Sequence, residues 1–293
     1  MTCGYRERWA AMSSLAVTLV DVGWGDSVLI ESEDKGRIHY ALIDSNDTTH
    51  ARSSYLFLKR FFERTNIVTT GNAKTFEFVL MTHSHADHAS GLPRIIREFG
   101  AKRFLHPNSN PHALLAQILR YQRRPGSRLA HTQAIDTTTN LGPIAFGAVN
   151  LDILWPQPGQ IDPDENNNSV VLALTLGGVS FLLTGDATAD VWAQILPKVP
   201  ANTRVFQVPH HGARNGTFDA AGGTPWLTHF QRQGMALQVA MSSHVRPHHH
   251  PHPDVVHALQ TANPPIEQFR TDLHYHLRFE TDGTNVDVTY SHT

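Results

Sequence analysis

The deciding stretch of this sequence is Thr82-His83-Ser84-His85-Ala86-Asp87-His88. It directly follows an apolar run, Phe76-Glu77-Phe78-Val79-Leu80-Met81, which is short, partly aromatic and ended by a break. Such a run is typical of a buried strand that ends in a loop. Imidazole nitrogens and carboxylate oxygens are ordinary ligands of zinc-like divalent ions. A solvated histidine-rich loop is the alternative in a chain with 20 His, but the order H-x-H-x-D-H favours a metal site.

The spacing within this stretch indicates two metal ions rather than one. His83 and His85 are two positions apart, so on extended backbone they point the same way and can share one ion. Asp87 and His88 come where the chain should turn into a helix, and they point toward a second ion. Two ions roughly 3.5–4 Å apart can hold the attacking and leaving oxygens of a hydrolysis together. The pattern therefore predicts a binuclear hydrolase.

Composition limits the class of protein. The chain has 293 residues, of which 40% are hydrophobic, enough for one large domain or two small ones. A formal net charge of −2 neither supports nor excludes a nucleic-acid substrate. The single cysteine, Cys3, excludes a disulfide framework and favours a reducing, cytoplasmic location. No stretch has the length of a membrane span, and residues 15–30 have the pattern of two strands around a glycine turn rather than of a signal peptide.

The order of apolar runs predicts an N-terminal extension over residues 1–14 and a single domain over residues 15–293. Two strand-rich halves, each followed by helices, indicate an α/β fold in which sheets are sandwiched between helices. Strands are predicted over 17–22, 27–31, 39–43, 76–81, 102–105, 144–155, 169–176, 179–183, 204–208, 237–242, 277–280 and 285–290. Helices are predicted over 54–64, 89–99, 112–123, 187–196 and 254–261.

Two later motifs also follow predicted strands. Asp186, in Thr184-Gly185-Asp186, is the natural carboxylate to bridge two ions, with a helix N-cap as the alternative. One imidazole of Pro209-His210-His211-Gly212 should complete the second ion. We favour His211, because the neighbouring glycine lets the backbone turn into the site. His210 is then a candidate to lie behind the ligands or to face the substrate.

Several other groups are candidates to surround this centre. The tract Pro247-His248-His249-His250-Pro251-His252-Pro253 is placed to overhang it, with a solvated loop as the alternative. His250 or His252 is therefore a candidate to contact substrate or to donate a proton. Asp44 is a candidate to hydrogen-bond a ligating imidazole, or it is a turn residue. Thr271 and Asp272 are candidates for a polar wall.

With these motifs in place, the sequence resembles the metallo-β-lactamase superfamily and, within it, the ComEC-like branch of competence proteins. H-x-H-x-D-H is the signature of that superfamily, and Thr184-Gly185-Asp186 matches its later aspartate motif. The resemblance covers roughly residues 15–290. Its other matches are Asp21-Val22-Gly23-x-Gly25-Asp26-Ser27, Leu42-Ile43-Asp44, Asn167-x-Ser169-Val170-Val171-Leu172, Val208-Pro209-His210-His211-Gly212, His250-Pro251-His252-Pro253 and Arg270-Thr271-Asp272.

The resemblance implies an αββα sandwich of the metallo-β-lactamase fold and two divalent ions, Zn²⁺ or Mn²⁺, at one edge. It implies the metal-ligand set His83, His85, Asp87, His88, Asp186 and His211, with Asp87 also in the catalytic group. One ligand departs from the pattern, because most of the superfamily gives the first ion a third histidine. The corresponding loop here is Asp164-Glu165-Asn166-Asn167-Asn168-Ser169. We expect the Asn168 amide oxygen or a water to stand in, and weaker binding of that ion.

The resemblance also implies hydrolysis of a phosphodiester, with a DNA strand as substrate. In the predicted reaction a hydroxide held between the ions attacks phosphorus, and His210, His250 or His252 protonates the leaving oxygen. Arg120, Arg123 and Arg124 are candidates to follow a phosphate backbone, with a solvated helix end as the alternative.

Other functions remain open from the sequence. Within the enzyme class, the alternatives are hydrolysis of a small phosphodiester, such as a choline phosphate ester or a cyclic nucleotide, and hydrolysis of a lactone or other ester. An alternative from a different class is that the chain is a metal-binding regulatory module with little catalytic activity. A defence effector switched on by a partner is the remaining alternative.

Overall fold

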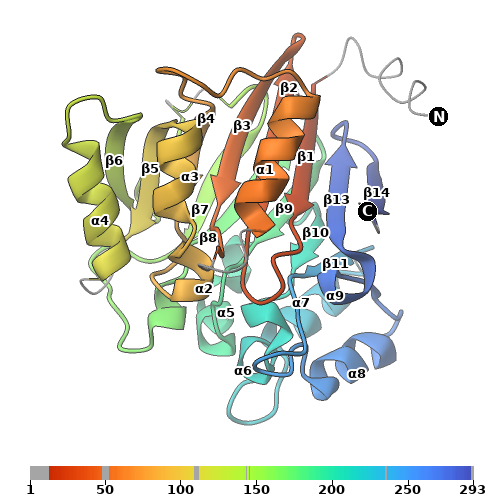
Figure 1. Ribbon diagram of the computed structural model, residues 1–293. Coiled ribbons are helices and arrows are strands. Elements are labelled where there is room, and N and C mark those ends of the chain that lie inside the picture. The colour runs from red at the N-terminus through yellow and green to blue at the C-terminus, as the bar shows by residue number, and fades with distance from the viewer. Residues whose placement is uncertain are drawn as a thin grey trace.

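Two β-sheets face each other in this protein, and helices cover both outer faces (Figure 1). The computed structural model describes residues 13–47, 53–108, 112–142, 144, 146–234 and 236–291. The αββα sandwich predicted from the sequence is therefore confirmed. The predicted extension over residues 1–14 lies almost wholly outside the described residues, and the first strand begins at Ser14.

The first sheet has the strand order β14-β13-β1-β2-β3-β4-β5-β6. Strands β3 to β6 are parallel, whereas β1, β2, β13 and β14 pair antiparallel. Its members are β1 (Ser14–Leu19), β2 (Val28–Asp34), β3 (Arg37–Ile43), β4 (Phe76–Leu80), β5 (Ala101–Pro107), β6 (Leu129–Ile135), β13 (His276–Thr281) and β14 (Val286–Ser291). β13 pairs with β1 and β14 pairs with β13, so this sheet joins both ends of the described chain.

The second sheet has the order β12-β11-β10-β9-β8-β7. Strands β9 to β12 are parallel, and β7 to β9 are antiparallel. Its members are β7 (Asn150–Trp155), β8 (Val171–Leu176), β9 (Val179–Leu183), β10 (Thr203–Gln207), β11 (Gln238–Met241) and β12 (Glu267–Arg270).

The helices divide between the two outer faces. Side chains of α1, α3 and α4 pack on the first sheet, which Figure 1 shows behind these helices, and side chains of α5, α7 and α8 pack on the second. The helices are α1 (Ser53–Arg64), α2 (Ala86–Ala89), α3 (Leu92–Phe99), α4 (Ala113–Gln122), α5 (Ala189–Ile195), α6 (Arg214–Thr217), α7 (Pro225–Gln233), α8 (Pro253–Thr261) and α9 (Thr271–His274). Short 3-10 turns cover Glu165–Asn168, Leu196–Lys198 and His210–Gly212. No helix in the described part of the chain is long and apolar enough to span a membrane.

Burial on both faces explains why the central strands are continuous apolar runs. In β8, Leu172 and Leu174 enter the core between the sheets, while Val171 and Ala173 pack under the helices of the outer layer. In β4, Phe78 lies between the sheets and Val79 lies under α1 and α3. A strand with helices on one face and a second sheet on the other has no solvated face, so polar alternation disappears.

The four-residue helices α6 and α9 were not predicted, nor were β6, β12 and α7, which lack a strong apolar signal. β6 is an edge strand of the first sheet with several exposed positions, and β12 is a four-residue edge strand of the second. Edge strands bury little, so their sequences stay polar. The helix α7 buries only three large side chains. One or two strands were predicted over residues 144–155, and the structure has one, β7, which covers only Asn150–Trp155.

Strands from both sheets end along the same rim. Asp44 follows β3, the H-x-H-x-D-H stretch follows β4, Asp186 follows β9, and His210-His211 follows β10. The carboxyl ends of parallel strands are where α/β folds collect functional groups.

Candidate metal centre

The H-x-H-x-D-H stretch packs tightly against the turn before β2. Asp87 and His88 lie in the short helix α2, and the turn before β2 lies against it, with Asp26 N donating to the Asp87 carbonyl oxygen at 3.2 Å. Gly25 has φ +98°, and a Cβ there would lie 2.2 Å from the Asp87 carbonyl oxygen. Only glycine permits this approach.

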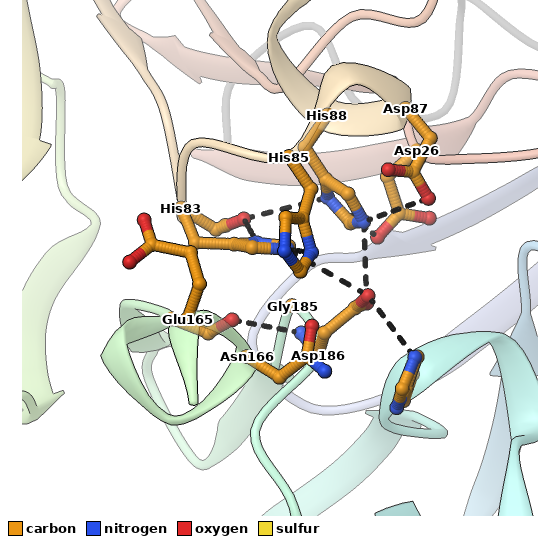
Figure 2. Close-up of polar contacts among 12 residues, drawn as sticks. Asp26, His83, His85, Asp87, His88, Glu165, Asn166, Gly185 and Asp186 are labelled. Carbon is orange, nitrogen blue, oxygen red and sulfur yellow. Dashed lines mark hydrogen bonds and ion pairs between the residues drawn. The ribbon is translucent and has the colours of Figure 1, made fainter. Parts of the chain in front are cut away.

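One group of ligand atoms lies around Asp186 Oδ1 and the ring of His88 (Figure 2). His88 Nε2 lies 3.2 Å and His211 Nε2 lies 3.4 Å from this oxygen. The two Nε2 atoms are 3.2 Å apart, and Asp87 Oδ2 lies 3.4 Å from His211 Nε2 and 3.7 Å from His88 Nε2. All four residues are buried.

A second group lies on the other carboxylate oxygen of Asp186. His83 Nε2 is 3.8 Å from Asp186 Oδ2 and 3.0 Å from Nδ1 of the exposed His85. Ligand atoms of His83, His85 and Asp186 all lie within 4.8 Å of one another. Asp186 is therefore shared by the two groups, one oxygen to each.

Hydrogen bonds on the far side of each ring fix which nitrogen faces these groups. His88 Nδ1 donates to Asp44 Oδ2 at 2.7 Å, and His211 Nδ1 donates to the Ser242 carbonyl oxygen at 3.0 Å. When both rings are neutral, each presents an Nε2 lone pair to the other, 3.2 Å away. Two lone pairs at that distance repel unless a cation lies between them.

The spacing of the first group fits a metal ion. A tetrahedral ion with bonds of 2.0–2.2 Å holds its ligand atoms about 3.3–3.6 Å apart. The contacts of His88 Nε2 and His211 Nε2 with each other and with the carboxylates of Asp87 and Asp186 are 3.2 to 3.7 Å. Asp186 Oδ1 is also buried without a hydrogen-bond partner. The residues present therefore fit a divalent cation.

The same groups are strongly coupled in charge. Burial opposes charge on His88 and His211, but nearby carboxylates, Asp186 first, raise the pKa of His88 well above its usual range and that of His211 to about 9. Burial also opposes the charge of Asp186, yet His88, His211 and His210 hold its pKa well below the usual range. Asp186 is therefore ionised, and the carboxylates of the cluster stabilise positive charge at the two rings, from a proton or from a bound cation.

Asp44 holds two of the rings at once. Its carboxylate is fully buried and accepts from Thr82 N at 2.7 Å and from Thr82 Oγ1 at 2.6 Å, besides the bond from His88. Thr82 Oγ1 in turn lies 3.1 Å from His83 Nδ1. Of the two interpretations offered by the sequence, this geometry fits a group that orients ligating imidazoles.

Asp26 is a site residue that the motif search did not single out. It is buried, its Oδ2 accepts from Gln207 Nε2 at 2.8 Å, and its Oδ1 has no hydrogen-bond partner. It lies within reach of His88, Asp186 and His211. Its close contacts, however, are to Nδ1 of His211 at 3.7 Å and Nδ1 of His88 at 3.9 Å, on the far side of both rings from Asp87. We therefore place it behind the rings. The signal that could have found it in the sequence is an aspartate directly after Gly25, at the end of a predicted glycine turn.

The backbone at the His-His pair is strained. His210 has φ 53° and His211 has φ 55°, in the left-handed region that side chains with a Cβ rarely adopt. This conformation turns both rings toward Asp186, with His210 Nε2 3.6 Å from its Oδ2. Such strain persists where the surrounding structure enforces it and is common at functional sites.

The two candidate proton donors of the histidine tract differ in place. The ring of His250 is half-buried, 5.9 Å from that of His210 and 6.4 Å from that of His211 between centroids. His252 instead caps helix α8, where its Nδ1 accepts from Asp254 N at 3.2 Å. The structure therefore brings His250 to the centre and makes His252 a helix cap.

The structure does not fit the expectation that the Asn168 amide oxygen takes the place of a metal-ligating histidine. That amide is used within its own loop, because its Oδ1 accepts from Asp162 N at 2.8 Å and its Nδ2 donates to Glu165 Oε2 at 2.9 Å. Glu165 Oε1 accepts from the N of Ser84, the residue between His83 and His85, at 3.1 Å. Asn166 Oδ1 is buried without a partner, and Figure 2 shows its amide turned toward Asp186.

The arginines proposed to bind substrate do not lie at the candidate metal centre. Tyr121 Oη accepts from Arg128 N at 3.1 Å, and the carbonyl oxygen of Arg128 accepts from the N of Ala101, the first residue of β5. The basic run Arg120, Arg123 and Arg124 therefore lies at the amino end of the parallel strands. The length of β5, about 20 Å, separates it from the rim that carries the centre.

Thr271 and Asp272 brace the loop that receives His211 rather than forming a wall. Thr271 is buried, and its Oγ1 accepts from Ser243 N at 2.9 Å. Asp272 accepts from Ser243 Oγ at 2.9 Å and pairs with Arg270 at 2.6 Å. The neighbouring Ser242 carbonyl accepts from His211.

The αββα sandwich with this group of carboxylates and imidazoles at the strand ends defines a metal-dependent hydrolase class. The chain belongs to the metallo-beta-lactamase superfamily, whose family model matches residues 70–222. A curated relative is ComE operon protein 3 of Bacillus subtilis (strain 168), 25% identical over 270 residues, or 87% of this chain and 32% of that protein. The chain thus spans about a third of the length of that relative.

Solved structures share the fold. The metallo-beta-lactamase fold protein YhfI from Bacillus subtilis covers 91% of this chain and is itself fully covered, with a TM-score of 0.56 and 14% identity. Igni18, a metallo hydrolase from the archaeon Ignicoccus hospitalis, has a TM-score of 0.51 and 16% identity over 94% of this chain and 99% of its own. At these identities the likeness concerns the fold alone.

Proposed function

We propose that this protein is a binuclear metal-dependent phosphodiesterase that cleaves a DNA strand. The observation that carries the proposal is the shared Asp186 carboxylate, whose Oδ1 belongs to one group of ligand atoms and whose Oδ2 belongs to the other. One carboxylate between two ligand groups suits two ions side by side, the arrangement used for in-line displacement at phosphorus. The resemblance to the ComEC-like branch supports DNA as the substrate.

The residues fit two unequal metal positions. Asp87, His88, Asp186 and His211 would hold one ion with four protein ligands. His83, His85 and Asp186 would hold the other, and we propose that Asn166 Oδ1, rather than Asn168, supplies its further oxygen. With the same number of imidazoles but one carboxylate fewer, this position should bind more weakly and accept Mn²⁺ as well as Zn²⁺. When bound, the ions neutralise phosphate oxygens and make water nucleophilic near neutral pH.

The chain's own side chains would supply positioning and a proton. His210 lies beside the shared carboxylate and the ring of His250 lies next to that of His210, whereas His252 caps α8. Burial and the neighbouring imidazoles lower the pKa of His250 to about 4, so its ring is neutral at pH 7. An anionic phosphate bound next to it would raise that pKa. His250, or His210 at 3.6 Å from Asp186 Oδ2, would then protonate the leaving oxygen.

A substrate panel tests this function directly. Labelled single-stranded DNA, duplex DNA, RNA and bis-p-nitrophenyl phosphate are each incubated with protein and Zn²⁺, Mn²⁺ or Mg²⁺. We expect metal-dependent cleavage of DNA that His83→Ala and Asp186→Ala abolish and that His131→Ala, an exposed histidine on β6, leaves unchanged. Wild-type rates in either site variant, or turnover of the small diester alone, would refute the proposal.

A further inference from the structure

A ladder of aromatic rings leads from the surface to the candidate metal ligands. The ring of Trp24, in the turn before β2, lies 5.2 Å from that of His248 between centroids. His248 lies 5.9 Å from His250, and His250 lies 6.4 Å from His211 at an interplanar angle of 26°. His248 is exposed and Trp24 is half-buried, so both rings are open to a ligand at the mouth of the centre.

The turn that carries Trp24 is held in one position. Gly23 N donates to Asp21 Oδ1 at 3.0 Å, and the Trp24 carbonyl oxygen accepts from the Asn46 amide. Gly25 packs directly on the backbone of Asp87. The backbone that carries the indole is therefore fixed relative to the ligand group, as a preorganised binding surface requires.

The exposure of this tryptophan has no packing explanation. The other tryptophans in the described ranges, Trp155, Trp192 and Trp226, are each at most 1% exposed and belong to the core under the outer helices. Trp24 contacts a surface loop instead, and Arg246 is exposed in that same loop. An indole together with a permanent positive charge two residues from its ring partner His248 in the sequence is a combination that suits single-stranded nucleic acid, through base stacking and phosphate attraction.

We propose that Trp24 and His248 form a stacking platform for an unpaired nucleobase next to the scissile phosphodiester. The platform selects single strands, because the faces of a base inside a duplex are already covered by its neighbours. This inference rests on the proposed function and adds to it the strandedness of the substrate. The basic run on α4 has no part in it, since that run lies at the opposite end of the strands.

Binding to matched strands tests the platform. The metal-loaded protein is titrated with a hydrolysis-resistant phosphorothioate single strand, and with a strand of equal length and backbone that has abasic sites throughout. Fluorescence anisotropy gives both affinities, and the tryptophan quenching that disappears in Trp24→Ala reports contact with the indole itself. Base stacking is worth about 1–3 kcal/mol, so we expect Trp24→Ala to weaken binding of the base-containing strand roughly 5- to 150-fold.

Control variants separate stacking from loss of structure. Trp24→Phe keeps an aromatic face and should retain most of the affinity, and His131→Ala should retain all of it. The abasic strand should bind wild type and Trp24→Ala alike. Equal losses on both strands, or no loss on either, would overturn the platform. Base-dependent binding without DNA cleavage would instead uphold the platform and refute the proposed hydrolysis.

Discussion

Replacing Asp44 with Asn tests how the buried network around the centre orients its ligands. The carboxylate accepts three hydrogen bonds of 2.6 to 2.7 Å, from Thr82 N, Thr82 Oγ1 and His88 Nδ1. The variant keeps the shape but turns one oxygen into an NH₂ group, which then meets a donor. Outer partners of this kind are worth 10- to 100-fold in metal affinity. We expect about that loss for the ion held by His88.

The same substitution should also cost folding stability. A hydrogen bond to a charged group contributes about 1.5–3 kcal/mol, and at least one such bond is lost in the variant. Glu77→Gln is the matched control, because Glu77 is also buried and lies 3.2 Å from His39 Nδ1, on the sheet and away from the centre. We expect it to lower the free energy of unfolding without changing metal affinity.

Calorimetric titration of chelator-treated protein with Zn²⁺ or Mn²⁺ resolves the two ions. Asp44→Asn should weaken mainly the four-ligand ion, since His83 contacts Asp44 only through Thr82. Thr82→Val removes that relay and should weaken mainly the other ion. Unchanged affinity in Asp44→Asn, or the reverse order of effects in the two variants, would contradict the arrangement of hydrogen bonds described here.

Three further predictions concern the asparagine loop, metal removal and acid stability. Asn166→Ala should weaken the ion beside His83 by about 10- to 100-fold, whereas Asn168→Ala should mainly lower the unfolding temperature, as titration and melting would show. Chelation should lower the unfolding temperature of wild type, because an ion at 100 times its Kd contributes about 2.7 kcal/mol; an unchanged melt would contradict this. Burial lowers the pKa of His276, whose Nδ1 accepts from Asp21 N at 3.0 Å, so the unfolded chain takes up the proton first. That stability is present above the ordinary pKa of about 6.5 and is lost as pH falls below it, and His276→Asn should reduce the loss in urea unfolding between about pH 7.5 and 5.5.

The sequence by itself determined the fold class and the kinds of ligand. Continuous apolar runs such as 76–81 and 179–183 required strands buried on both faces, and the polar motifs after them required functional groups at strand ends. These are local properties, because a run of apolar side chains and the residue that follows it are neighbours in the chain. The spacing of His83 and His85 was readable for the same reason.

Only the tertiary structure decided which groups meet. Asp26 and Asp186 lie 160 positions apart, yet both lie within ligand distance of His88. The sequence showed that Arg120, Arg123 and Arg124 form a basic run. The direction of α4, however, takes this run to the end of the strands opposite the metal centre. The sequence alone does not distinguish Asn166 from Asn168. In the structure, the Asn168 amide oxygen is used in a hydrogen bond within its own loop, whereas the Asn166 amide oxygen has no partner. Side-chain direction and long-range pairing depend on how the sheets pack, which no local pattern encodes.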